Sequence, residues 1–221
     1  QLHPYANIWI SFMLLCVLRT FSHSWSAPML APGSASALCC FSELQRMIKG
    51  ETQMRALLCF VADVLRPGGY FFGTTTASGA IWTLAQKEIT HRESQKRRGH
   101  PLSKDVRVKM KLFELRLPGG DNLQPIGTEY LIRYRSVAPS TQPEAEFLVH
   151  FPTLVEQAKD VGLRMLSITN FRDFWEDHRK TSNDLLRALL SAEFTHGDPP
   201  LLASQDIDLI SLFCTFIFIK D

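Results

Sequence analysis

The segment Val64–Thr76, which reads VLRPGGYFFGTTT, constrains the fold more than any other part of this chain. Before the corner, apolar residues recur at helical spacing, namely Met54, Leu57, Leu58, Val61 and Leu65. Pro67 and the two glycines that follow it end this helix and turn the chain, because glycine adopts backbone angles that are closed to other residues. The aromatic run Tyr70–Phe72 then predicts a buried strand. A helix, a tight corner and a strand in this order indicate an α/β domain.

Strands and helices alternate through the remainder of the sequence. The apolar run Met13–Phe21 predicts a parallel strand that is covered on both faces. We further predict a helix from Ser78, strands over 108–117 and 129–134, a helix from Phe151 that ends at Gly162, a strand over 164–169, a helical stretch over 171–191 and a closing strand within 208–221. This alternation predicts one partial domain over residues 1–221, with a mostly parallel sheet and helices on both faces. Residues 27–50 and about 88–107 read as insertions or loops.

Composition argues against several classes of protein. The five cysteines are an odd number without a C-x-x-C spacing, so we expect neither a disulfide framework nor a metal site. The apolar run Ile8–Leu18 is too short to span a bilayer, and we expect no membrane segment. The net charge of +2 does not by itself indicate a nucleic-acid-binding protein, but residues 91–111 contain eight Lys or Arg residues against two acidic ones. This basic segment either steers RNA or forms a solvated loop.

Three segments of the sequence, in order, carry a more specific signal. They are LRPGGYFFGTT (65–75), EFLVHFPTLVEQAKDVGLRML (146–166) and SLFCTFIFIKD (211–221), with SHSWS (22–26) as a weaker fourth. Together they resemble the eukaryotic mRNA cap guanine-N7 methyltransferases, and the Glu-aromatic-Leu-Val-x-Phe-Pro pattern of the middle segment is the most diagnostic. The resemblance implies a Rossmann-like class I methyltransferase fold, S-adenosylmethionine as methyl donor, the capped 5′ end of mRNA as partner and a nuclear location.

The resemblance also implies which residues bind the cap guanine. Glu146 takes the place of the family's glutamate, and a carboxylate can accept hydrogen bonds from the N1–H and N2 amino donors of guanine. Phe213 and His23 stand where the family has tyrosines, in its closing strand and in its His-Tyr-Ser-aromatic motif, and either ring can stack on the base. Guanine N7 carries a free lone pair at neutral pH, so we expect alignment of the reactants and no general base. The alternatives are a solvated Glu146, a core Phe213 and a loop His23 without a special role.

The cofactor-binding half of the family's fold has no counterpart in this sequence. In the family a Gly-rich turn after the first strand holds the methionine part of S-adenosylmethionine, whereas the glycines here begin at Gly33 and none follows a strand as G-x-G. We therefore expect a fold truncated in its N-terminal half and no measurable binding of S-adenosylmethionine by this chain alone. Either the sequence is a fragment of a longer enzyme, or a partner chain supplies the missing half, or the gene model is faulty.

Two functions stay open at this point. The first is methyl transfer to N7 of the cap guanine, with other capping enzymes as further partners. The alternative is a non-catalytic, methyltransferase-like subunit that binds RNA or supports a catalytic partner.

Overall fold

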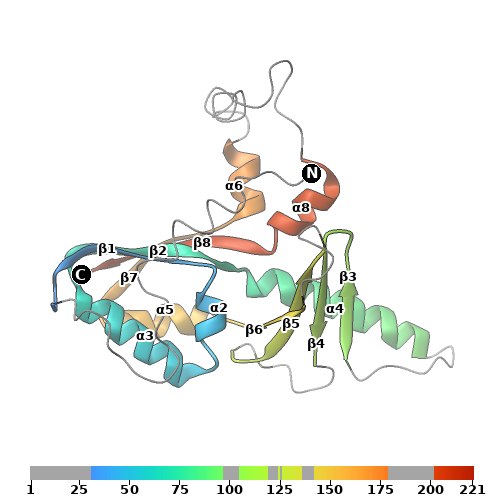
Figure 1. Ribbon diagram of the computed structural model, residues 1–221, viewed down its shortest axis with the longest axis horizontal. Helices are drawn as coiled ribbons and strands as arrows, with labels where there is room; N and C mark the ends of the chain where they lie inside the picture. Colours follow the sequence, from blue (N-terminus) through green and yellow to red (C-terminus); the bar gives the residue numbers. More distant parts are fainter. Residues whose placement is uncertain (1–30, 97–104, 119–123, 125, 136–141, 179–201) are drawn as a thin grey trace, which may run out of the picture.

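The computed structural model describes residues 31–96, 105–118, 124, 126–135, 142–178 and 202–221. In this part of the chain the strands form two four-stranded sheets, one with the order β1-β2-β8-β7 and one with the order β3-β4-β5-β6 (Figure 1). Helices and strands alternate along the sequence except for the four successive strands of the second sheet, and the domain is an α/β domain as predicted.

The first sheet is mixed. Its strands are β1 (Ala35–Phe41), β2 (Leu65–Thr76), β8 (Phe213–Lys220) and β7 (Leu163–Asn170). β1 runs parallel to β2, whereas β8 is antiparallel to both β2 and β7. The predicted α/β class therefore holds, but the described sheet is mixed where a mostly parallel one was expected. The alternation of strands and helices does not fix strand direction, because an antiparallel neighbour needs no crossover helix and the chain can simply reverse into β8.

The Pro-Gly-Gly corner lies inside β2 and not before it. The helix α3 (Glu51–Val64) passes directly into β2, where Ala35 of β1 pairs with Leu65 and Ala37 pairs with Tyr70. The four residues 66–69 therefore loop out of the ladder as an irregular bulge, and Gly68 adopts a φ of 75° there. Proline is tolerated in a sheet at such a bulge, since its missing N–H removes no ladder hydrogen bond.

Helices α3 and α5 (Phe151–Asp160) cover one face of the first sheet (Figure 1). Their apolar faces pack on the strands in one buried cluster that includes Leu58, Val61, Leu154, Phe71, Phe216 and Phe218. Pro152 lies in the first turn of α5, and Gly162 follows it with a φ of 79°, which confirms the predicted start and end of this helix. Helices α6 (Phe171–His178) and α8 (Ser204–Ile210) lie on the other side of the sheet, beside β8.

The second sheet is antiparallel throughout. Its strands are β3 (Val106–Lys109), β4 (Phe113–Leu117), β5 (Glu129–Tyr134) and β6 (Glu144–Phe147). One face packs on α4 (Ser78–Lys96) through a second buried cluster that includes Ile81, Ala85, Phe113, Leu115, Tyr130 and Ile132. The segment 108–117, predicted as one strand, thus contributes to two strands that form a hairpin.

The predicted insertions contain regular structure. Within 27–50 the structure places β1 and the short helix α2 (Leu44–Met47), and within 88–107 the helix α4 continues to Lys96 and β3 begins at Val106. The strand β1 was not predicted because the small residues before Leu38 are typical of a loop. The short run Leu38–Phe41 that follows them is nevertheless apolar enough for a strand. Met13–Phe21 and residues 97–104 lie outside the described residues.

Candidate functional site

Glu146 lies on β6 at the junction of the two sheets. Its Cα is paired with that of Tyr130 on β5, and its side chain is only 2% exposed. The strand β5 alternates exposed and buried residues, so Tyr130 points to the same covered face as its partner on β6. A carboxylate at such a position costs free energy unless it is hydrogen-bonded, and the structure supplies the donors.

Two donors reach the carboxylate of Glu146 from different elements. The Tyr130 hydroxyl lies 2.5 Å from Oε2, and Nε2 of Gln45 on α2 lies 3.5 Å from Oε1. The Tyr130 oxygen is also 3.0 Å from Oγ1 of Thr76. A phenol has a single proton and the carboxylate is the stronger acceptor, so Thr76 donates to Tyr130 while Tyr130 donates to Glu146.

A further buried contact extends this network into β2. The hydroxyl of Thr75 donates to Oε1 of Gln45 at 2.9 Å, and Thr75, Thr76 and Gln45 are all at most 1% exposed. The sequence pattern indicated none of Gln45, Thr75 and Tyr130. The available signals were the small polar tail Gly73–Thr76 at the end of an apolar strand and the alternation in Glu129–Tyr134.

Burial and hydrogen bonding act on the carboxyl pKa in opposite directions. Burial raises the pKa of Glu146 above its usual value and is the largest effect. The hydrogen bonds from Tyr130 and Gln45 and the charge of Arg46 lower this pKa, and the neighbouring Glu144 raises it. Burial and the nearby carboxylate raise the pKa of Tyr130 well above its usual value, so Tyr130 keeps its proton and stays a donor.

Phe213 begins β8 beside the same network. Its Cα pairs with that of Thr76, and its half-buried ring lies 6.4 Å from the ring of Tyr134 at an interplanar angle of 21°. The ring of Phe171 lies 6.1 Å away on α6. The structure therefore brings Phe213 and Glu146 to the same end of β2. This proximity does not by itself assign a role to either residue.

His23 lies outside the described residues. The described strand that pairs parallel with β2 is β1. The residues that follow this strand are Ser42–Gln45, and Gln45 contributes to the Glu146 network. A role for His23 stays a prediction.

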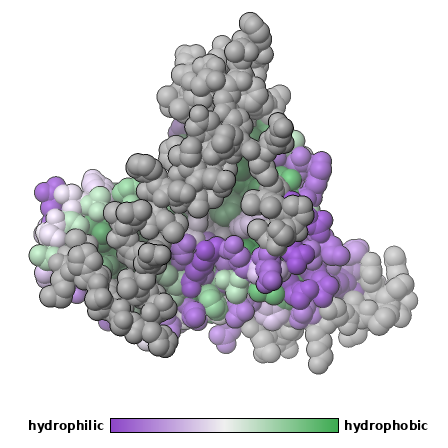
Figure 2. Space-filling view, in the orientation of Figure 1, coloured by the Kyte–Doolittle hydropathy of each residue, from purple (hydrophilic) through white to green (hydrophobic). Residues whose placement is uncertain are grey.

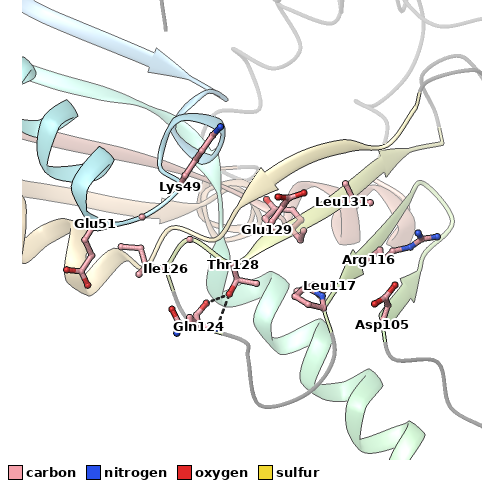
Figure 3. A pocket seen from close by; sticks show the side chains of 14 residues that line it. Lys49, Glu51, Asp105, Arg116, Leu117, Gln124, Ile126, Thr128, Glu129 and Leu131 are labelled. Carbon is pink, nitrogen blue, oxygen red and sulfur yellow. Dashed lines mark hydrogen bonds between the residues drawn. The ribbon is translucent and has the colours of Figure 1, made fainter. Parts of the chain in front are cut away.

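A cleft of about 640 Å³ lies next to the network but does not contain Glu146 (Figure 3). Tyr130 contributes to its wall, together with Lys49, Arg116, Thr128 and Glu129. Among the described residues no cluster of His, Cys, Asp or Glu side chains could hold a metal ion, and no helix is long and apolar enough to cross a membrane.

The fold and the buried carboxylate define an α/β domain with a polar site where two sheets meet. Residues 39–221 match the family described as the mRNA (guanine-N(7))-methyltransferase domain, and the chain belongs to this family. It is 33% identical over 193 residues to mRNA cap guanine-N(7) methyltransferase 2 of Arabidopsis thaliana, an alignment that covers 84% of this chain and 51% of that protein. The protein of the same name from Oryza sativa subsp. japonica is 30% identical over 190 residues, with 84% and 52% covered.

The chain spans about half the length of the curated relatives it matches. Among solved structures, an S-adenosylmethionine-dependent methyltransferase from Mesorhizobium loti aligns with a TM-score of 0.40 at 12% identity, over 86% of this chain and 64% of that chain. A similarity of this size supports no argument about the site.

Proposed function

We propose that this chain is part of an enzyme that transfers a methyl group from S-adenosylmethionine to N7 of the guanine cap of mRNA. Membership of the family supports the reaction class. The observation that carries the proposal is Glu146, a buried carboxylate that two donors hold in place at the meeting point of the sheets.

The carboxylate suits the Watson–Crick edge of guanine. Each carboxylate oxygen has two lone pairs, and the donors from Tyr130 and Gln45 use one on each oxygen. The remaining lone pairs can accept the N1–H and N2 amino protons of guanine, a paired contact that adenine cannot make because its N1 is an acceptor. The carboxylate would orient the base and leave N7 to attack without a general base.

The aromatic side chain of Phe213 supports the same proposal. It begins β8 opposite Thr76 at the end of β2, and its ring lies 6.4 Å from the ring of Tyr134 and 6.1 Å from that of Phe171. An aromatic ring can stack on a purine, and stacking is worth about 1–3 kcal/mol per base. We propose His23 as a further stacking residue on the family resemblance alone.

S-adenosylmethionine supplies the methyl group when it is bound. Among the described residues no Gly-rich turn follows a strand, and β1 leads through Ser42 directly into α2. These residues do not fit the methionine part of the cofactor, and we assign none of them to it.

The outer face of the second sheet would bind the RNA chain. Arg107 and Arg116 are exposed and paired directly across β3 and β4, and Arg133 lies on the same face of β5. Within the described part of the chain none of these arginines forms an ion pair. Like charges opposite each other destabilise a sheet, whereas a phosphate backbone would neutralise them. Figure 2 shows hydrophilic side chains gathered over these strands.

Methyl transfer to cap guanine is tested on the protein expressed from its native transcript, so that any sequence beyond these 221 residues is included. Transfer from labelled S-adenosylmethionine to capped RNA is measured for Glu146→Ala and for Glu156→Ala, an exposed control on α5. We expect Glu146→Ala to lower kcat/KM for capped RNA by about 100-fold, because a paired contact to a charged group is lost, with cofactor affinity unchanged. Unchanged methylation would refute the assignment of Glu146.

The same assay separates the two candidate functions. A wild-type protein that binds capped RNA and transfers no methyl group would be a non-catalytic subunit that needs a catalytic partner. Co-purification from the native source would show whether another chain or other capping enzymes accompany it. A fluorescent fusion tests the proposed nuclear location.

A further inference from the structure

Gln45 is a buried amide with a defined partner at both ends. It lies on α2 and is 1% exposed, and no pattern in the sequence indicated a role for it. Its Nε2 donates to the carbonyl oxygen of Ser42 at 3.0 Å and to Oε1 of Glu146 at 3.5 Å. Its Oε1 accepts from the hydroxyl of Thr75 at 2.9 Å. The amide thus connects the end of β1, the end of β2 and the strand β6.

These partners allow only one orientation of the amide. The Ser42 carbonyl can only accept and an ionised Glu146 can only accept, so both require the amino group of Gln45. Rotating the amide by 180° would place its oxygen against two other oxygens and its amino group against the Thr75 hydroxyl. The acceptor-only Ser42 carbonyl therefore fixes which end of Gln45 faces the carboxylate. The Thr75 hydroxyl then donates to the amide oxygen in this orientation.

The main chain around Gln45 supports this orientation of the amide. Ser42 has a φ of 55°, an uncommon conformation for a residue other than glycine, and its N–H donates to the Thr74 carbonyl at 2.9 Å. This contact ties the first residue after β1 to β2. The Ser42 carbonyl is in turn presented to Gln45 at the first turn of α2.

We propose that Gln45 is a positioning residue for the guanine-binding carboxylate: its amide holds Oε1 of Glu146 while Tyr130 holds Oε2, so that the free lone pairs of the carboxylate point toward the base. This inference rests on the proposed function of Glu146. Thr75 acts one step further away, because it holds the amide in place by donating to its oxygen. The two donors also favour the ionised carboxylate, which is the form that can accept both guanine protons.

The test compares matched variants of the protein expressed from its native transcript. Gln45→Met keeps the length of the side chain and removes both amide contacts. Thr75→Val removes only the hydroxyl, and Thr75→Ser keeps it. Arg55→Met is the control, because Arg55 lies on α3, is exposed and pairs with Asp160 outside the amide network. The pH profile of kcat/KM for capped RNA, the KM for each substrate and Tm are measured for all variants.

We expect Gln45→Met to raise KM for capped RNA about five- to tenfold, because one hydrogen bond to a charged group is lost. The KM for S-adenosylmethionine should not change. The acidic limb of the pH profile should move to higher pH, since a carboxyl with fewer donors holds its proton more tightly. Thr75→Val should show smaller shifts in the same directions, and Thr75→Ser should restore the wild-type values.

The possible failures are distinguishable. If Gln45→Met and Thr75→Val lower Tm but leave the acidic limb and KM for capped RNA at the wild-type values, Gln45 is a structural residue and the inference is wrong. If Gln45→Met does not fold, the pair Thr75→Val and Thr75→Ser decides by the same readouts. If Glu146→Gln also leaves cap methylation unchanged, the proposed function itself has failed.

Discussion

The hydroxyl oxygen of Tyr130 lies 2.5 Å from Oε2 of Glu146, and the two residues are directly paired across β5 and β6. The contact therefore depends on strand register. A shift of one residue in either strand would turn one of the two side chains to the opposite face of the sheet. The pairing explains how a carboxylate can stay buried at the junction of the two sheets and still be held in a single orientation.

Replacing Tyr130 by Phe should destabilise the protein. The change removes the donor and leaves a buried carboxylate oxygen short of a partner, at a cost of about 1–3 kcal/mol in the free energy of unfolding. Urea denaturation followed by circular dichroism measures the change. Tyr70→Phe is the control, because Tyr70 is 44% exposed on β2. Equal stability of the two variants would show that the hydroxyl of Tyr130 contributes nothing to the fold.

Replacing Glu146 by Gln should stabilise the protein at neutral pH. Because burial raises the carboxyl pKa, the folded state binds the proton more tightly than the unfolded state. The free energy of unfolding therefore falls as pH rises from the usual value of 4.5 through the raised one. We expect Glu146→Gln to be more stable than wild type by about 1 kcal/mol at pH 7.5, a typical size for a single replacement.

This gain should disappear below about pH 4, where the carboxyl is protonated in both states. Thermal melts of wild type and variant across the pH range measure the difference. A difference that is constant with pH would show that Glu146 has its ordinary pKa in the folded state.

Replacing Gly73 by Ala should strongly destabilise the protein. A Cβ at this position would lie 1.7 Å from the carbonyl oxygen of Cys40 on the adjacent β1, so the parallel pair could not close. We expect a loss of about 4 kcal/mol or more in unfolding free energy, or no folding. Gly79→Ala is the matched control in α4, where a Cβ meets nothing within 4 Å, and it should be neutral or slightly stabilising.

The proposed stacking role of Phe213 can be tested by two substitutions, one that keeps the aromatic face and one that keeps only the apolar volume. Phe213→Tyr retains an aromatic face and should leave the affinity for capped RNA within about twofold. Phe213→Leu retains apolar volume without the face and should weaken binding about tenfold, if a base stacks on the ring. Fluorescence anisotropy with labelled capped RNA measures both affinities, and Tm is followed in parallel. A loss of Tm without a loss of affinity in Phe213→Leu would make Phe213 a core residue.

The sequence predicted the helices and strands with distinctive ends better than those without them. The helix α5 begins at Phe151 and is closed by Gly162, and Pro152 and that glycine mark both ends. The strand β1 was missed, because its first residues are small and it follows a segment rich in Ser, Ala and Pro. Strand direction in the first sheet also had no signature in the sequence.

The sequence alone determined the class of domain, the corner at Pro67–Gly69, and Glu146 as the acidic residue to examine, because these features depend on local backbone chemistry and on a contiguous motif. Only the tertiary structure brought Gln45, Thr75 and Tyr130 to that carboxylate. Gln45 and Glu146 are 101 residues apart in the chain, and their contact depends on the packing of α2 against β6. Whether a buried acid is held and ionised is decided by the donors around it, and those donors come from elements that no local pattern connects.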